Sequence, residues 1–140
     1  MIIYGDTSAL AKLVIEEQGT PEMLSAANNA EVLASVAIAY VELRAAVAAA
    51  LRDGRLPSVQ RDTKILYLER LWQSMSEIAI DGPLLRHAGD LAESMRLRSY
   101  DAVHLAALLK YGGPGEVIFA CWDANLRRAA AELGYSLIPS

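Results

Sequence analysis

The sequence predicts an α/β fold in which a parallel sheet of four to five strands is covered by helices on both faces. Short apolar runs alternate with longer segments of helical spacing, which is the pattern of such a sheet. The runs "MIIY" and "VIFAC" are almost wholly apolar, as expected of strands that are buried on both faces. With 140 residues, 54% of them hydrophobic, the chain can bury one proper core, so we expect a single domain over residues 1–140.

The predicted strands are short and are separated by helical segments. The first, "MIIYGD", ends at Asp6, and the fourth, "EVIFACWD", ends at Asp123. The predicted strands are residues 1–6, 31–36, 76–81, 116–123 and 135–139.

The helices between them have recognisable ends. Ser8 is a plausible cap and Gly19 a plausible stop for the first helix, and Thr20 with Pro21 favours the start of the second. Asp81 stands at the start of a later helix, with a proline two residues on. The predicted helices are residues 7–19, 20–30, 37–53, 59–75, 81–95, 99–111 and 124–134.

Composition excludes several classes of protein. The most apolar region, residues 32–51, carries Glu42 and Arg44 in its middle, so no membrane span is predicted. No basic segment precedes the first apolar residues, which argues against a signal peptide, and a single cysteine, Cys121, fits a cytoplasmic location. A formal net charge of -4 argues against a protein that holds nucleic acid by bulk positive charge alone, although local binding stays open.

Four carboxylates interrupt apolar runs in separate parts of the chain. Asp6 and Asp123 end predicted strands, and Glu42 lies in the first turns of the helix that follows another strand. Asp101 opens the apolar helix "SYDAVHLAALLKY". Because ligand sites in open parallel sheets lie outside the carboxyl ends of the strands, we expect the four acids to converge.

Converging carboxylates require a partner, because they repel one another and their pKa values rise. A divalent cation relieves this repulsion. An oxygen-only donor set suits Mg²⁺ or Mn²⁺, and Mg²⁺ usually keeps water molecules and accepts phosphate oxygens. The pattern therefore predicts a metal site that can take a phosphate group.

Each acid also has a purely structural interpretation. Asp6 and Asp123 fit as helix N-caps, and Asp101 as a first-turn acid favoured by the helix dipole. Glu42 fits as a partner of Arg44 or of its helix start. For any single acid the structural interpretation is the more common one, and only their joint placement favours a site.

The neighbouring polar residues are less decisive. His104 lies one turn after Asp101, where a packed histidine at a helix interface is favoured over a site residue. Cys121 is expected in the core, and Thr7, Ser8 and Asn125 fit either local capping or the site. Six basic residues lie near the acids and could contact phosphates or simply be solvated: Lys12, Arg44, Arg96, Arg98, Arg127 and Arg128.

Four segments resemble the PIN domain, in its VapC-type toxin branch. They are "DTSALAKLV", "VELRAAVAAALRDG", "LRSYDAVHLAALL" and "WDANLRRAAAELGYSLIP", in the order of that family and over nearly the whole chain. The resemblance implies a PIN-like three-layer α/β/α sandwich. It carries the acidic quartet of the family onto Asp6, Glu42, Asp101 and Asp123. Trp122 departs from it, since many relatives have a small or polar residue there.

The same resemblance implies a function. It indicates an Mg²⁺- or Mn²⁺-dependent endoribonuclease, the toxin of a toxin–antitoxin pair, with RNA as substrate and a cognate antitoxin as inhibitor. The antitoxin is expected in an apolar groove formed by residues 8–29 and 37–52, with a basic side chain placed among the carboxylates. A homodimer, using surface between residues 59 and 95, or a toxin–antitoxin hetero-oligomer is also implied.

Two other functions remain open from the sequence. A non-catalytic RNA- or protein-binding PIN module would share the fold, but the intact quartet counts against it. A phospho-signalling receiver domain also places acids around Mg²⁺ at strand ends. It would usually have two adjacent acids after the first strand and a late lysine, and no lysine follows Lys110 here.

Overall fold

A computed structural model describes all residues, 1–140, as five parallel strands and seven α-helices. The strands are β1 (Ile2–Gly5), β2 (Val32–Val36), β3 (Ser76–Ile78), β4 (Val117–Ala120) and β5 (Leu137–Ile138). The helices are α1 (Thr7–Val14), α2 (Thr20–Asn29), α3 (Ile38–Arg52), α4 (Arg61–Ser74), α5 (Gly82–Ser94), α6 (Ser99–Tyr111) and α7 (Ala124–Glu132). None of these helices has the length and apolar character needed to cross a membrane.

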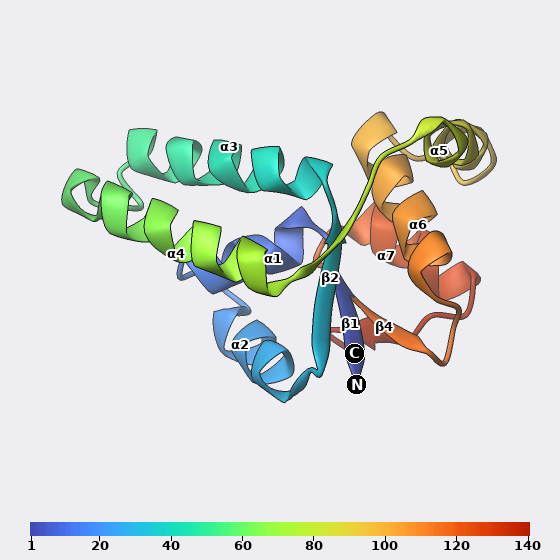
Figure 1. The fold of residues 1–140 in the computed structure, drawn as a ribbon, viewed down its shortest axis with the longest axis horizontal. Coiled ribbons are helices and arrows are strands. Elements are labelled where there is room, and N and C mark those ends of the chain that lie inside the picture. The colour runs from blue at the N-terminus through green and yellow to red at the C-terminus, as the bar shows by residue number, and fades with distance from the viewer.

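The sheet has the strand order β3-β2-β1-β4-β5, so the chain reverses direction across the sheet between β3 and β4. The connections up to β3 place α1–α4 on one face, and the later ones place α5–α7 on the other (Figure 1). Right-handed crossovers require this change of face when the direction of winding reverses. The predicted three-layer α/β/α architecture is confirmed.

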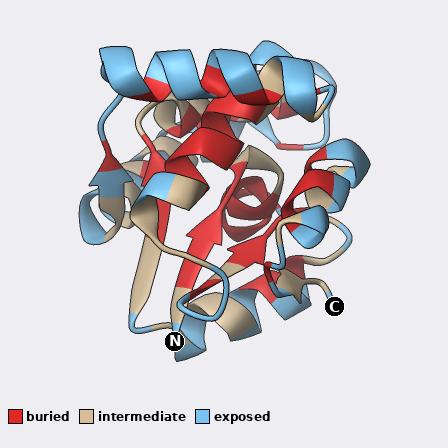
Figure 2. Cartoon of the chain, turned by 90° about the vertical axis from the view of Figure 1, so that its right-hand side faces the viewer, coloured by how far each residue is buried: buried red, intermediate tan, exposed pale blue.

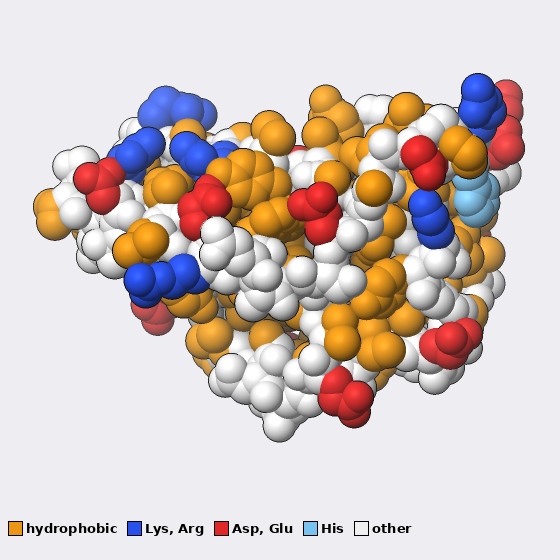
Figure 3. Space-filling view, in the orientation of Figure 1, with side chains coloured by type: hydrophobic (Ala, Val, Ile, Leu, Met, Phe, Trp, Pro, Cys, Tyr) orange, Lys and Arg blue, Asp and Glu red, His pale blue; other side chains and the backbone are white.

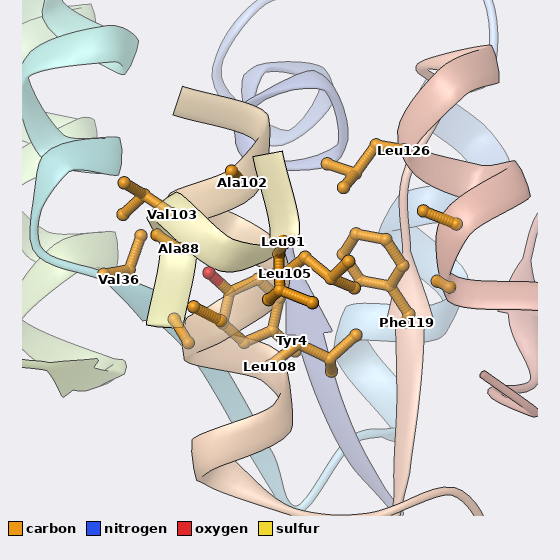
Figure 4. Packing of buried hydrophobic residues seen from close by; sticks show 14 of the residues in the cluster. Tyr4, Val36, Ala88, Leu91, Ala102, Val103, Leu105, Leu108, Phe119 and Leu126 are labelled. Atoms are coloured by element: carbon orange, nitrogen blue, oxygen red, sulfur yellow. The ribbon is translucent and has the colours of Figure 1, made fainter. Parts of the chain in front are cut away.

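Side chains alternate between two cores, one on each face of the sheet. In β1, Ile3 packs against α1–α4, while Tyr4 packs with Phe119 against α5–α7. Figure 2 shows the buried strands and the buried inner faces of the helices, and Figure 4 shows Leu105 and Leu108 of α6 beside Tyr4. The central strands are therefore buried on both sides, which explains their nearly continuous apolar sequence.

The structure corrects the predicted ends of the first two helices. Asp6, not Ser8, caps α1, and the helix ends at Val14 rather than at Gly19. Gly19 instead precedes α2 with a φ of 92°, so Thr20 is the first residue of α2 and not its cap. A β-carbon on Gly19 would lie 2.8 Å from the indole nitrogen of Trp122, so this position requires glycine for both its conformation and its space.

The α3–α4 pair forms a long arm that projects from the sheet (Figure 1). A short 3₁₀ turn at Ser58–Gln60 precedes α4, where one continuous helix from residue 59 was predicted. The other predicted elements occur within a few residues of their expected positions.

Candidate active site

The carboxyl ends of β1 and β4 lie side by side and carry the first two acids. Asp6 directly follows β1 and caps α1, and its backbone N–H donates to Ala120 O of β4 at 3.1 Å. Asp123 follows β4 and caps α7. Neighbouring parallel strands whose connections diverge to opposite faces leave a crevice between them, and both acids lie at this point.

Asp6 is a buried carboxylate, 4% exposed, with three local donors. Its Oδ1 accepts from the Ser8 hydroxyl at 2.6 Å and from the Ala9 backbone N–H at 3.0 Å. The Cys121 thiol approaches Oδ2 at 3.1 Å. Burial raises the pKa of Asp6 above its usual value, although these hydrogen bonds oppose the shift.

Asp123 is held by α7 in the same manner. Its Oδ1 accepts from the Leu126 backbone N–H at 2.9 Å, while no hydrogen bond occupies Oδ2. The chain before it is fixed to α1, since the Trp122 backbone N–H donates to the Ser8 hydroxyl oxygen at 2.8 Å. Ser8 thus connects the two capped helix starts.

Glu42 enters the site from α3 and is oriented by residues of three other elements. Its Oε1 accepts from the Thr7 hydroxyl at 2.7 Å and lies 2.9 Å from His104 Nε2. The other imidazole nitrogen, Nδ1, is 2.9 Å from the Tyr4 hydroxyl. With the proton on Nε2, the ring donates to Glu42 and accepts from Tyr4, so both contacts are satisfied by one tautomer.

This hydrogen-bonded chain keeps Glu42 charged. Burial alone would raise the pKa of Glu42, but the contacts with His104 and Thr7 outweigh it and lower the pKa below its usual value. Burial also raises the pKa of the Tyr4 hydroxyl, so Tyr4 stays protonated and can donate. Glu42 Oε2 has no hydrogen-bond partner and remains available.

Asp101 lies in the first turn of α6 and is the least restrained of the four. Burial, and then the negative charge of Asp123, raises its pKa above the usual value. Its one salt-bridge partner is Arg98, whose Nε lies 4.0 Å from Oδ2 on a largely exposed side chain. Glu42, Arg98 and Asp101 line one open pocket of about 230 Å³.

Asp6 and Asp123 thus follow neighbouring strands, Glu42 and Asp101 line one pocket, and the charge of Asp123 acts on Asp101. No three His, Cys, Asp or Glu side chains approach closely enough to be a ready-made metal site. Asp6 and Asp123 do cap helices, so the prediction that these two residues are helix N-caps is confirmed. Each cap uses Oδ1, while Asp6 Oδ2 contacts the Cys121 thiol and Asp123 Oδ2 forms no hydrogen bond.

The contact of His104 with Glu42 is not predicted by the sequence pattern. His104 is 2% exposed, as a packed histidine should be, yet it also contacts Glu42. Its helical spacing from Asp101 was the only local signal. Arg44, by contrast, does not pair with Glu42, since its guanidinium contacts Tyr40 and Glu69.

The sequence matches the PIN domain family over residues 3–132. The chain belongs to the PIN domain family. Two relatives from Mycobacterium tuberculosis strains, named Ribonuclease VapC45 and Ribonuclease VapC49, are each 34% identical over 99% of this chain and 96% of their own length. The resemblance inferred from the four sequence segments is confirmed.

Several solved structures share this fold. PAE2754 from Pyrobaculum aerophilum superposes with a TM-score of 0.70 at 17% identity, covering 99% of this chain and 85% of that one. FitAcB from Neisseria gonorrhoeae gives a TM-score of 0.64 at 19% identity, covering 98% and 96%. VapBC-1 from nontypeable Haemophilus influenzae gives 0.64 at 15% identity, covering 100% of each chain.

Replacing Asp6 by Asn should stabilise the metal-free PIN domain at neutral and higher pH. Asn keeps the oxygen that caps α1 and removes a buried charge. Because the native pKa of Asp6 is raised, the native state binds this proton more readily than the unfolded state, and stability is lost as pH rises through the raised pKa.

The measurement is the melting temperature in a chelator across about pH 4 to pH 8, where ~1 kcal/mol corresponds to roughly 2–4 °C. The advantage of Asp6→Asn should grow with pH. Asp90→Asn, which changes an exposed carboxylate on α5, is the control and should track the wild type. A difference that is independent of pH would contradict the buried-charge explanation.

Replacing His104 by Ala should lower the free energy of unfolding by about 2–4 kcal/mol, because it leaves a cavity and removes the partner of Tyr4. Glu42→Gln keeps an oxygen that accepts from Thr7 and His104, so its change should stay within roughly 1 kcal/mol. Urea denaturation of the two variants distinguishes them. Equal losses would mean that His104 does not carry the hydrogen-bonded chain.

Proposed function

We propose that this PIN domain is a metal-dependent endoribonuclease and acts as the toxin of a toxin–antitoxin pair. The observation that carries the proposal is that Asp6 and Asp123 follow the neighbouring strands β1 and β4, while Glu42 and Asp101 line one pocket. The names of the VapC relatives support hydrolysis of RNA as the reaction.

The donor set fits Mg²⁺ or Mn²⁺. The oxygens free of hydrogen bonds are Glu42 Oε2, Asp123 Oδ2 and those of Asp101, and hard divalent cations prefer such carboxylates. Cys121 is unsuited as a soft ligand, because burial raises the pKa of its thiol. The ion would be held by Asp101, Asp123 and Glu42. Asp6, at the end of β1, would add a further negative charge nearby.

When bound, the ion supplies an activated water and neutralises charge that develops on the phosphodiester. The protein residues prepare that chemistry. His104 and Thr7 fix the orientation of Glu42, and the two helix caps fix Asp6 and Asp123, so these carboxylates need little reorganisation when RNA arrives. Arg98, exposed beside Asp101, is placed to contact the RNA backbone.

The quartet variants test this proposal. Asp6→Asn, Glu42→Gln, Asp101→Asn and Asp123→Asn should each remove most cleavage of a mixed RNA pool in Mg²⁺ or Mn²⁺, and double variants should lose little more because the groups act together. Mn²⁺ should raise the wild-type melting temperature and raise that of Asp101→Asn less. Asp90→Asn should cleave normally, and sequencing of product ends identifies the target.

Cleavage that survives loss of any two quartet residues would rule out a shared catalytic centre. RNA binding without cleavage by the wild type, in either metal, would instead support the non-catalytic module.

The partner proposed for this toxin is an antitoxin segment in an apolar groove. A groove of about 480 Å³ runs between α1, α2 and α4, and Leu24 and Tyr67 are exposed on its walls. The second wall is α4, not the helix at residues 37–52 that the sequence suggested. Two solved structures of similar fold are of VapBC proteins, VapBC2 from Rickettsia felis and VapBC-1 from nontypeable Haemophilus influenzae, which supports a protein partner.

Leu24→Glu should weaken antitoxin binding at least tenfold, since it places a charge in an apolar contact. The control is Leu85→Glu on α5, which is also exposed but lies on the other face of the sheet. The assay is co-purification with the product of the adjacent small reading frame, followed by calorimetry and an RNA cleavage gel. Equal binding by both variants would place the antitoxin elsewhere.

A further inference from the structure

A second polar pocket, separate from the one that Glu42 and Asp101 line, has no role in the proposal above. It lies between the end of α5 and the outer face of α7 and has a volume of about 500 Å³. This volume falls within the range of small-ligand sites. The lining residues are Ser94, Met95, Arg96, Asn125, Arg128 and Glu132.

Both walls of this pocket lie close along the chain to acids of the quartet. Asn125 lies in the first turn of α7, two residues after the capping Asp123. On the other wall, the turn between α5 and α6 carries Arg96 into the pocket and Arg98 to within 4.0 Å of Asp101. Leu97 between them is 8% exposed and anchors the turn in the core.

Arg96 occupies a backbone conformation that favours glycine. Its φ is 55°, and it is the only residue other than glycine with a positive φ. The turn ends α5 with a bond from Leu97 N–H to Ala92 O at 3.1 Å, a helix ending in which glycine is usual at the left-handed position. A long cationic side chain therefore occupies a position whose backbone conformation would be less strained with glycine.

The charge of Arg96 is not compensated within the protein. Arg128 is already engaged, since it donates to Met95 O at 2.9 Å and to Glu132 at 3.1 Å. Arg96 forms no salt bridge. The pocket thus offers one free guanidinium together with the Asn125 amide and the Ser94 hydroxyl, which suits a single anionic group with several acceptor oxygens.

We propose that this pocket binds a phosphodiester group of the RNA strand next to the bond cleaved at the carboxylates, with Arg96 as its main ligand. The inference rests on the proposed ribonuclease function. It would let a protein of net charge -4 hold RNA beside four carboxylates. A protein segment is the weaker candidate, because Met95 is the only apolar residue of the lining and offers little to anchor one.

The other concentration of positive charge, on the α3–α4 arm in Figure 3, has a different character. Arg44, Arg55 and Arg61 of this arm form ion pairs with nearby carboxylates. Such a surface suits long-range attraction of RNA rather than a fixed contact with one phosphate.

Arg96→Gly is the decisive variant, because glycine suits the local backbone and should keep or raise the melting temperature. Binding of a labelled single-stranded RNA is measured by fluorescence anisotropy in a chelator. We expect about tenfold weaker binding and a salt dependence whose slope falls by about 0.7. Arg96→Lys should fall between, and the control Arg86→Ala, at an exposed position on α5, should bind like the wild type.

A second RNA series carries one uncharged methylphosphonate linkage at each position in turn. At one linkage adjacent to the cleaved bond, the wild type should lose about the same tenfold, whereas Arg96→Gly should lose almost nothing, since a shared contact is lost only once. Equal binding by wild type and Arg96→Gly overturns the inference and leaves the cleavage proposal intact. RNA binding that depends on Arg96, without metal-dependent cleavage, contradicts the cleavage proposal alone. If Arg96→Gly loses antitoxin binding but keeps RNA binding, the pocket belongs to a protein partner and the inference is overturned.

Discussion

The adjacency of β1 and β4 is the constraint on which the site depends. These two strands are neighbours in the sheet although more than a hundred residues separate them, and their connections leave toward opposite faces. The helix starts that follow them must therefore emerge side by side. Asp6 and Asp123 cap these helices, and Ser8 links them, so the fold itself creates the crevice and places acids in it. Glu42 of α3 and Asp101 of α6, one from each layer of helices, line one pocket.

The acids differ in how well the protein stabilises their negative charge. Glu42 receives hydrogen bonds from Thr7 and His104 and has a lowered pKa, so it is a stable carboxylate even without a cation. Asp6 and Asp101 have raised pKa values, and burial is the main cause for both. The acids with raised pKa values are those that a nearby positive charge would stabilise most.

The sequence predicts the sheet well because strands depend on local signals, and the same signals single out the quartet, whose shared role stays a prediction. Continuous apolar runs mark strands buried on two faces, and an acid that interrupts such a run is conspicuous. The errors concern contacts made across the fold. Ser8 looks like a cap locally, but Asp6 takes that place and Ser8 binds Trp122 N–H across the β1–β4 crevice. His104 reads correctly as a core residue, and only the packing of α6 against β1 and α3 reveals that Tyr4 and Glu42 are its partners.

The distribution of charge reconciles an acidic protein with an anionic substrate. The segment from Arg44 to Arg70 contains six basic and three acidic residues, so the α3–α4 arm is positive while the rest of the chain carries the excess negative charge. Interactions between exposed charges decay over about 10 Å at moderate salt, so the arm can attract RNA without offsetting the carboxylates at the sheet edge. Close to the acids, RNA must be contacted by basic side chains that the fold holds near them. The turn between α5 and α6 supplies such groups, because it is anchored by buried Leu97 and carries Arg96 into one pocket and Arg98 into the pocket that Glu42 and Asp101 line.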